Sequence, residues 1–327
     1  MAMRLGDDFF YLKRHILALI VGLAAMYAGY RTRHFELPNI SVMFFLISVT
    51  LLLLAVIPGV GVGAGGATRW IKIGFISFQP AEIAKLALII YIAAELAVKR
   101  TIKELFPLLG MILIMLLLVI KEPDIGTTAV LALISFSMFF LAGVDKKYIL
   151  YSFGTGAAAA ALLSIAEPYR MRRLTAFLSP WQDPQGGGFH IIQSLIAVGS
   201  GGLFGLGLGQ SKQKFFYLPQ NYTDFIFAIF CEEIGLIGAI GLTLLFFLFV
   251  ARGLKIVRNA PDDFSMLLAG GIVSWIGLQA FLNICVVLSL VPTTGIPLPF
   301  ISYGGTAMVV ALYAIGLLLN ISSYKRA

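Results

Sequence analysis

Charged residues are scarce in this sequence of 327 residues: they make up 12% of it, whereas 59% of the residues are hydrophobic. An ordinary soluble domain carries about twice that charged fraction. The mean hydropathy of +0.94 points the same way. The shortage of charge therefore excludes an ordinary soluble globule and makes the lipid bilayer the main solvent of this chain.

Cysteine is also scarce, and the usual signatures of soluble enzymes are absent. Cys231 and Cys285 both lie in apolar runs, so neither a disulfide framework nor a metal-ligand pair with one of the three histidines is expected. The sequence contains no G-x-x-x-x-G-K-[ST], H-E-x-x-H or G-x-S-x-G motif, and the glycines of 199–209 do not fit G-x-G-x-x-G. Without a nucleotide site, any group transfer must use a donor that is already activated.

Nine apolar runs are long enough to cross the membrane as helices, since about 20 residues span the roughly 30 Å of hydrocarbon. No small-residue cleavage site follows the first run, so no removable signal peptide is expected. The fold class predicted is an all-α polytopic bundle of about nine transmembrane helices in a single membrane domain, residues 1–327. The runs are 15–30, 40–57, 81–98, 105–120, 126–143, 148–165, 225–250, 265–290 and 303–321.

Basic clusters set the predicted orientation, because short cytoplasmic loops carry the excess of Lys and Arg. Counted alternately, the spans bring these clusters to one face, which we expect to be cytoplasmic together with the C-terminus, while the N-terminus lies outside. The same placement at the ends of apolar runs argues against nucleic-acid binding despite a net charge of +8. The clusters are Arg31/Arg33, Lys99/Arg100/Lys103, Lys146/Lys147, Arg252/Lys255/Arg258 and Lys325/Arg326.

Two irregular stretches stand out on the opposite, extracytoplasmic side. Residues 167–224 form the one extensive polar segment, and within it the run 189–198 is too short to span, which predicts a re-entrant or surface helix. Residues 291–305 contain three prolines and three glycines between two spans. Irregular backbone at membrane depth needs protein or water around it, so this second stretch is predicted to line a cavity.

The outer face is unusually basic for a face that the positive-inside rule leaves poor in cations. One interpretation is that a long translocated loop is exempt from the rule. The other is a binding site for an anionic lipid headgroup. The residues concerned are Arg69, Lys72, Lys85, Lys121, Arg170, Arg172, Arg173, Lys212 and Lys214.

Asp224 is the first of the candidate catalytic acids, because it lies where the polar segment turns into an apolar helix. It fits either a helix N-cap or a general base, and the two roles are compatible. Glu232 and Glu233 follow about 12 Å deeper, at 1.5 Å per residue. Charged groups at that depth face a bundle interior or a wet cavity, and a packing role for both is favoured slightly.

Glu82, Lys85 and Asp124 lie at the outer starts of two other spans. Glu82 and Lys85 share a helical face at i, i+3 spacing, so an intrahelical ion pair is the simple interpretation. Against it, Lys85 is well placed to meet a phosphate at headgroup level. Asp124 is either a helix cap or a site residue.

Several long motifs follow one another in order along this sequence: Arg69-Trp70-Ile71, 75–85, 122–127, 169–184, 210–235 and 292–305. Together they resemble the motifs of the SEDS family of polyprenol-dependent peptidoglycan glycosyltransferases. The resemblance runs from about Asp8 to the C-terminus. The stretch QSKQKFFYL at 210–218 is most similar to the division and sporulation branch (FtsW- and SpoVE-like).

The resemblance implies polymerisation of lipid II outside the bacterial cytoplasmic membrane, with inversion and release of undecaprenyl pyrophosphate. Asp224 would be the general base, and a class B penicillin-binding protein transpeptidase of the division or sporulation machinery would be the partner. A divalent cation, Mg²⁺ or Mn²⁺, is also implied, although nothing in the sequence fixes its ligands. The implied substrate-binding residues are Glu82, Lys85, Arg69, Trp70, Asp124, Arg172, Arg173 and Ser302.

Two departures from the family pattern bear on these expectations. The family usually has ten spans, whereas we expect this sequence to begin in the loop after the first, and Gln220 stands where the family commonly has Glu. A lipid II flippase and a non-catalytic scaffold that recruits a transpeptidase stay open as alternatives. Acids at one outer edge, rather than in paired repeats at the midplane, favour the enzyme over the flippase.

Overall fold

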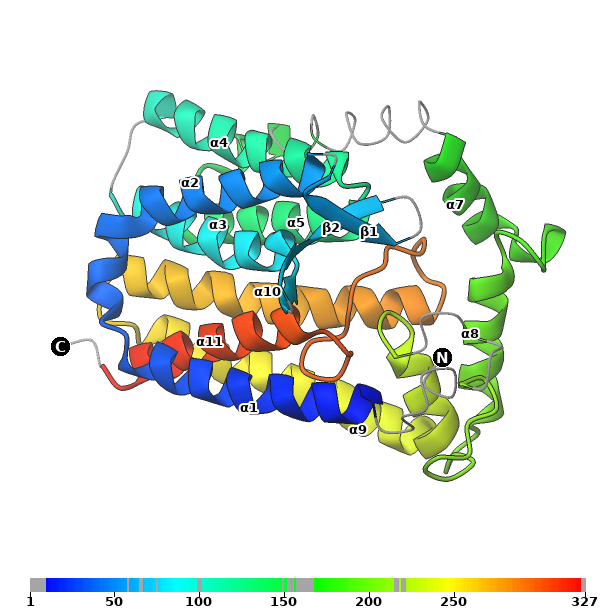
Figure 1. Ribbon diagram of the computed structural model, residues 1–327. Helices are drawn as coiled ribbons and strands as arrows, with labels where there is room; N and C mark the ends of the chain where they lie inside the picture. The colour runs from blue at the N-terminus through cyan, green and yellow to red at the C-terminus, as the bar shows by residue number, and fades with distance from the viewer. Residues whose placement is uncertain are drawn as a thin grey trace. The chain divides into compact units, whose positions relative to one another are not determined.

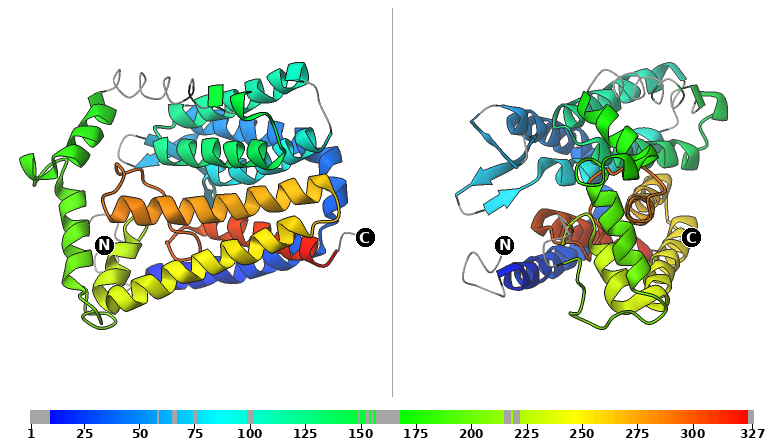
Figure 2. Two further views of the ribbon diagram at one scale, coloured as in Figure 1. Left: turned by 180° about the vertical axis from the view of Figure 1, so that it is seen from behind. Right: turned by 90° about the vertical axis from the view of Figure 1, so that its right-hand side faces the viewer.

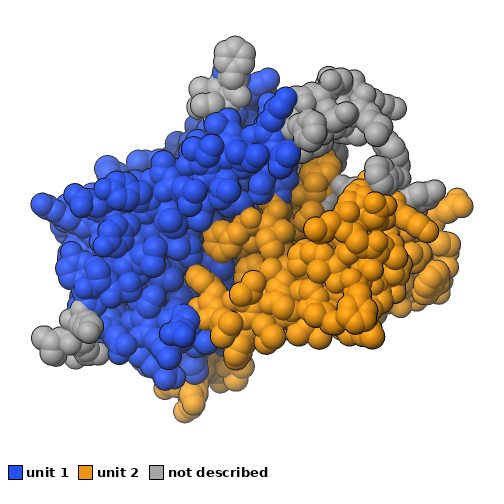
Figure 3. All heavy atoms as spheres, turned by 90° about the horizontal axis from the view of Figure 1, so that it is seen from below, with its two compact units in different colours: residues 1–143, 250–278, 303–327 blue, residues 144–249, 279–302 orange. Residues whose placement is uncertain are grey.

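The computed structural model describes residues 10–324, apart from gaps at 58, 65–66, 75, 99–101, 149, 152–153, 155, 157–167, 215–217 and 219–221. Helices dominate the described residues (Figure 1). The chain divides into two compact units, which Figure 3 colours separately. Unit 1 comprises residues 1–143, 250–278 and 303–327, and unit 2 comprises residues 144–249 and 279–302.

Unit 1 holds most of the long apolar helices. Five helices of the described chain, namely α1, α2, α9, α10 and α11, are long and apolar enough to cross a membrane. α9 and α10 each continue from one unit into the other. The helices with residues in unit 1 are α1 (Phe10–Arg31), α2 (Leu37–Val56, preceded by the 3-10 turn η2, His34–Glu36), α3 (Pro80–Ala97), α4 (Ile102–Lys121), α5 (Ile125–Leu141), α9 (Ile226–Arg258), α10 (Asp263–Val287) and α11 (Gly305–Ser322).

Eight of the nine predicted spans correspond to described helices, with ends that differ by a few residues in most cases. The ninth, 148–165, lies largely outside the described residues. α9 is the exception in length, because it runs on to Arg258 rather than ending near 250. Its last turns carry Lys255 and Arg258, which suit the negative end of a helix dipole.

α1 and α11 lie side by side along their length (Figures 1 and 2). Their backbones approach closely because a glycine stands at each contact: a Cβ on Gly29 would overlap the carbonyl oxygen of Tyr313, and one on Gly316 would overlap that of Met26. Small residues at such contacts are typical of membrane helix pairs. At the end of this pair the buried His34 Nδ1 lies 2.5 Å from Asn320 Oδ1.

A small antiparallel sheet stands between α2 and α3, which the sequence analysis did not predict. Its order is β1 (Gly61–Ala64), β2 (Ala67–Ile73) and β3 (Ile76–Phe78). Val62 pairs with Trp70, and Ile71 pairs with Phe78. The strands are too short and too rich in glycine to give a strong alternating pattern, so the sequence signal was weak.

Unit 2 contains the polar segment and the irregular stretch near the C-terminus. The helices of the polar segment are α7 (Pro168–Leu178), η3 (Pro180–Gln182) and α8 (Phe189–Ser200). The predicted short helix at 189–198 is thus confirmed as a helix. Its placement as a re-entrant or surface helix stays a prediction. A hydrophobic cluster joins α8, the first part of α9 and the end of α10 through Ala197, Phe225, Ala228 and Val287.

α9 is broken at Gly235, whose φ of 76° and ψ of −172° are not helical. The amides of Leu236 and Ile237 donate to Gly202 and Leu203 at 2.9 and 3.2 Å, instead of to the preceding turn of the helix. The carbonyls of Glu232 and Glu233 accept in turn from the amides of Leu206 and Gly207 at 2.9 and 3.0 Å. The loop 202–207 therefore satisfies the backbone groups that the break exposes, as a helix end in an apolar setting requires.

Candidate functional site

The candidate residues of unit 1 gather at the starts of α3 and α5. Pro80 begins α3, a position where its missing N–H costs no hydrogen bond. One turn further, Lys85 Nζ lies 2.8 Å from both carboxylate oxygens of Glu82. Both side chains are buried, and Lys85 Nζ also lies 5.0 Å from the ring centroid of Trp275. The simple interpretation as an intrahelical ion pair is therefore confirmed, in a buried setting that gives each charge a partner.

Asp124 is the N-cap of α5, as one of its two predicted roles required. Its Oδ1 accepts from the amide of Thr127 and its Oδ2 from the Thr127 hydroxyl, each at 2.9 Å. Gln79, the N-cap residue of α3, donates through Nε2 to Asp124 Oδ2 at 3.5 Å. The two helix starts are thus joined by side chains. A carboxylate at a helix N-terminus is also favoured by the helix dipole.

Arg69 fixes the turn between α4 and α5. Its Nε donates to the carbonyl of Glu122 at 2.9 Å, and its Nη2 donates to the carbonyl of Pro123. Glu122 is fully buried, and neither of its side-chain oxygens has a hydrogen-bond partner among the described residues. Burial and then the charge of Asp124 raise the pKa of Glu122 to about 8, against the opposing effect of Arg69. Glu122 is therefore a buried acid that favours its neutral form.

Asp224 is the central candidate residue of unit 2. α9 begins at Ile226, which puts Phe225 rather than Asp224 at the N-cap position. Asn283 Nδ2 donates to the Asp224 carbonyl at 2.8 Å and to the Ile296 carbonyl at 2.7 Å. A Cβ on Gly295 would lie 3.4 Å from Asp224 Oδ2. The end of α10 thus holds the backbone of Asp224 and links it to the irregular stretch 291–302.

Further contacts tie the same stretch to the polar segment. Arg173 Nη1 donates to the Thr293 carbonyl at 3.1 Å. Ser302 Oγ donates to the Thr223 carbonyl at 2.6 Å and accepts from the Leu298 amide at 2.7 Å. Ser302 therefore acts on the backbone just before Asp224, which gives it a structural role in this site.

Two predicted substrate-binding residues, Arg172 and Trp70, make no side-chain hydrogen bond within the described part of the chain. Arg172 is exposed on α7. Trp70 is half-buried in strand β2. Substrate binding by these residues stays a prediction, as it does for Glu82, Lys85, Arg69, Asp124, Arg173 and Ser302. Gln220, the departure noted in the sequence, lies outside the described residues.

The structure adds three residues that the sequence analysis did not single out: Trp275, Asn283 and His190. The His190 ring stacks on that of Phe225, with centroids 6.0 Å apart, and its Nδ1 is buried without a hydrogen-bond partner among the described residues. Burial and then Arg173 lower the pKa of His190. No local signal marks these residues, because each is a lone polar or aromatic residue in an apolar run.

The predicted divalent cation finds no ligand set among the residues that the structure describes. No three His, Cys, Asp or Glu side chains of these ranges are close enough together to hold a metal ion. The divalent cation stays a prediction.

Residues 1–327 match the family described as "Cell cycle protein", which groups FtsW, RodA and SpoVE. The sequence is 43% identical to stage V sporulation protein E of Bacillus subtilis (strain 168), over 99% of this chain and 90% of that protein. It is 41% identical, with the same coverage, to a probable peptidoglycan glycosyltransferase FtsW of Geobacter sp. (strain M18).

Solved structures agree with this assignment. One chain, from a structure described as "Structural coordination of polymerization and crosslinking by a peptidoglycan synthase complex", matches with a TM-score of 0.81 and 28% identity, over 97% of this chain and 90% of that one. The rod shape determining protein RodA of Thermus thermophilus matches with a TM-score of 0.73 and 27% identity, over 97% of this chain and 89% of that one.

The fold and its buried polar groups define a polytopic helical membrane protein. The chain belongs to the SEDS family, and its relatives at about 40% identity carry the names of the division and sporulation branch.

Proposed function

We propose that this protein is a peptidoglycan glycosyltransferase that polymerises lipid II into glycan strands on the outer face of the bacterial cytoplasmic membrane. Family membership supports this activity, because a relative that is 41% identical over nearly the whole chain bears the name probable peptidoglycan glycosyltransferase FtsW. The relatives' names also support a role in division or sporulation.

The observation that carries the proposal is the anchoring of Asp224. Its main chain is held by Asn283, and the hydroxyl of Ser302 holds that of the preceding residue, Thr223. A general base must be held within hydrogen-bond reach of the proton that it removes, and a fixed backbone supplies such an orientation. Each of these hydrogen bonds satisfies a backbone carbonyl in an apolar setting, where an unpaired polar group would be costly.

In the proposed reaction, Asp224 takes the proton of the acceptor sugar's 4-hydroxyl as the oxygen attacks the anomeric carbon of the lipid-linked donor. The bond from that carbon to the pyrophosphate oxygen breaks, the configuration inverts, and undecaprenyl pyrophosphate leaves. Lys85 and Arg173 are assigned to the negative charge that develops on the leaving group. Glu82 holds Lys85 through their ion pair, and Arg69 shapes the neighbouring turn.

We further propose that the partner is a class B penicillin-binding protein. The N-terminus is proposed to be extracytoplasmic and the C-terminus cytoplasmic. The similar chain from a peptidoglycan synthase complex, in which polymerisation is coordinated with crosslinking, supports a transpeptidase partner. The basic clusters at the ends of the spans support the orientation.

Polymerisation of lipid II by purified protein, with and without its cognate transpeptidase, tests the proposal. Asp224→Asn should reduce polymerisation by 10²-fold or more, because a general base contributes about 10²–10⁴-fold. Asp145→Asn is the matched control, since Asp145 is exposed in a turn. If the native protein with its partner makes no polymer at matched folded yield, the flippase or the scaffold interpretation replaces this one.

A further inference from the structure

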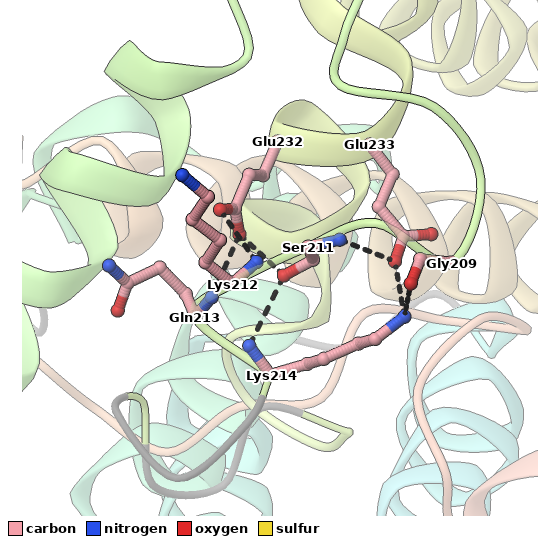
Figure 4. A network of polar contacts seen from close by, with 7 residues as sticks. All are labelled: Gly209, Ser211, Lys212, Gln213, Lys214, Glu232 and Glu233. Atoms are coloured by element: carbon pink, nitrogen blue, oxygen red, sulfur yellow. Dashed lines mark hydrogen bonds and ion pairs between the residues drawn. The ribbon is translucent and has the colours of Figure 1, made fainter.

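Glu232 and Glu233 form a polar network with the turn 209–214 that the proposed reaction does not use (Figure 4). Glu232 Oε2 accepts from the Ser211 hydroxyl at 2.5 Å and from the Gln213 amide at 3.3 Å, while Oε1 accepts from the Lys212 amide at 3.0 Å. Glu232 and Ser211 are both buried. One carboxylate thus holds three consecutive residues of the turn.

Glu233 completes the network from the next position of the helix. Its Oε1 accepts from Lys214 Nζ at 3.0 Å and from the Ser211 amide at 3.4 Å. Lys214 Nζ also donates to the Gly209 carbonyl at 2.5 Å. This ion pair is partly exposed, so it contributes less than the buried Glu232 contacts.

The network lies at the end of a short helical segment that starts beside Asp224. At the break at Gly235, the amides of Leu236 and Ile237 donate to the loop carbonyls of Gly202 and Leu203, so the helical hydrogen-bond pattern between Ile226–Ile234 and the rest of α9 is interrupted at these two positions. The backbone of 202–207 and the carboxylates of Glu232 and Glu233 hold this end instead. The orientation of the segment therefore depends on contacts with the loop.

A second connection leads from the turn back toward Asp224. The Leu218 amide donates to the Gln213 carbonyl at 3.0 Å, and the Leu218 side chain is buried in the same hydrophobic cluster as Phe225, the residue after Asp224. The turn held by Glu232 is thus linked to Asp224 by the helical segment and by the packing of Leu218.

We propose that Glu232 is a positioning residue for this reaction. Its buried carboxylate fixes the turn 209–214 to the helical segment Ile226–Ile234 and thereby holds Asp224 in its working position. The inference rests on the proposed function. It assigns a role to Glu232 that involves no contact with the substrate.

Glu232→Gln tests this role with little change in shape, because it replaces one of the two acceptor oxygens by an NH₂ group, which cannot accept a hydrogen bond from a backbone amide of the turn. We expect kcat for lipid II polymerisation to fall about tenfold with KM within twofold, since displacements near 1 Å cost up to 10²-fold. Hydrogen exchange of the amides of 211–214 should become faster. A general loss of stability would instead lower the folded yield without this split between kcat and KM.

Ser211→Ala is the second variant, and it removes the hydroxyl that bridges Glu232 Oε2 and the Lys214 amide. We expect a smaller fall in kcat, and the double variant should lose no more than Glu232→Gln alone, because both changes break one network. Asp262→Asn is the matched control. Asp262 holds the Ser265 amide and hydroxyl at 2.9 and 2.7 Å, so the same kind of contact is weakened at the start of α10.

The outcomes separate this inference from the proposed function. If native protein polymerises lipid II and Glu232→Gln keeps its kcat within twofold while 211–214 exchange faster, the positioning role is wrong. Unchanged exchange in Glu232→Gln overturns it as well. If native protein makes no polymer, the proposed function fails first and this inference fails with it.

Discussion

Lys85 and Glu82 form a buried ion pair on α3, with Nζ 2.8 Å from each carboxylate oxygen and side chains only 2% and 3% exposed. Removal of one partner leaves an unpaired charge in a nonpolar setting, which costs about 3–5 kcal/mol. We therefore expect Lys85→Met to lower the thermal unfolding midpoint of the purified protein in detergent strongly.

The double variant Lys85→Met/Glu82→Gln removes both charges and should recover most of that stability, because no unpaired ion remains. If Lys85 stabilises the negative charge of the leaving group, the double variant should nevertheless be inactive in the polymerisation assay. If Lys85→Met had the same thermal unfolding midpoint as the native protein, that result would contradict the buried pairing.

Glu122 predicts a pH dependence of stability. Its pKa is raised from 4.5 to about 8 by burial and by Asp124. Between these values the folded protein holds a proton that the unfolded chain has released, so this group makes stability fall as pH rises, by up to about 1.4 kcal/mol per pH unit. Below pH 4.5 the effect is absent, and above pH 8 it is complete.

Glu122→Gln should remove this dependence. The difference in unfolding midpoint between the variant and native protein, measured from pH 5 to 9, should grow with pH and level off near pH 8. Glu36→Gln, at an exposed acid, is the control. A difference that stays constant over this range would show that Glu122 has an ordinary pKa.

Gly295 predicts a local effect on Asp224. Its φ is +75°, and an added Cβ would lie 3.4 Å from Asp224 Oδ2. Gly143→Ala is a close control, since Gly143 has φ +72° and no neighbour within 4 Å of the added Cβ. Both alanines should cost about 1 kcal/mol of backbone strain. Only Gly295→Ala should also lower kcat, and equal activity of the two variants would argue against crowding at Asp224.

The contact between α1 and α11 predicts a loss of stability without a direct effect on chemistry. Gly29→Ala would force the helices apart, because its Cβ overlaps the Tyr313 carbonyl oxygen. We expect a loss of about 1–3 kcal/mol, as for overpacking in a core. Gly110→Ala in α4 meets nothing within 4 Å and should stabilise its helix by about 0.5–1 kcal/mol. Equal unfolding midpoints for the two variants would show that the helices can separate without cost.

Sequence alone predicted the helices and the family. The long apolar runs place α1, α2, α9, α10 and α11 within a few residues at most of their ends, since a membrane helix must satisfy its own backbone and bury about 20 residues. Asp124 as a cap and Glu82 with Lys85 as a pair were also readable, because both depend on spacing within one helix.

Only the tertiary structure decided which distant groups meet. The break at Gly235 and the loop that bridges it, the Glu232 carboxylate on residues 211–213, and Asn283 on Asp224 all join segments far apart along the chain. Their side chains give no periodic signal, because one polar residue in an apolar run has the same local pattern whatever it contacts. Local hydrophobicity and helix spacing therefore determine the spans and the local pairs, whereas the long-range polar contacts depend on packing, which sets the partner of each buried polar group.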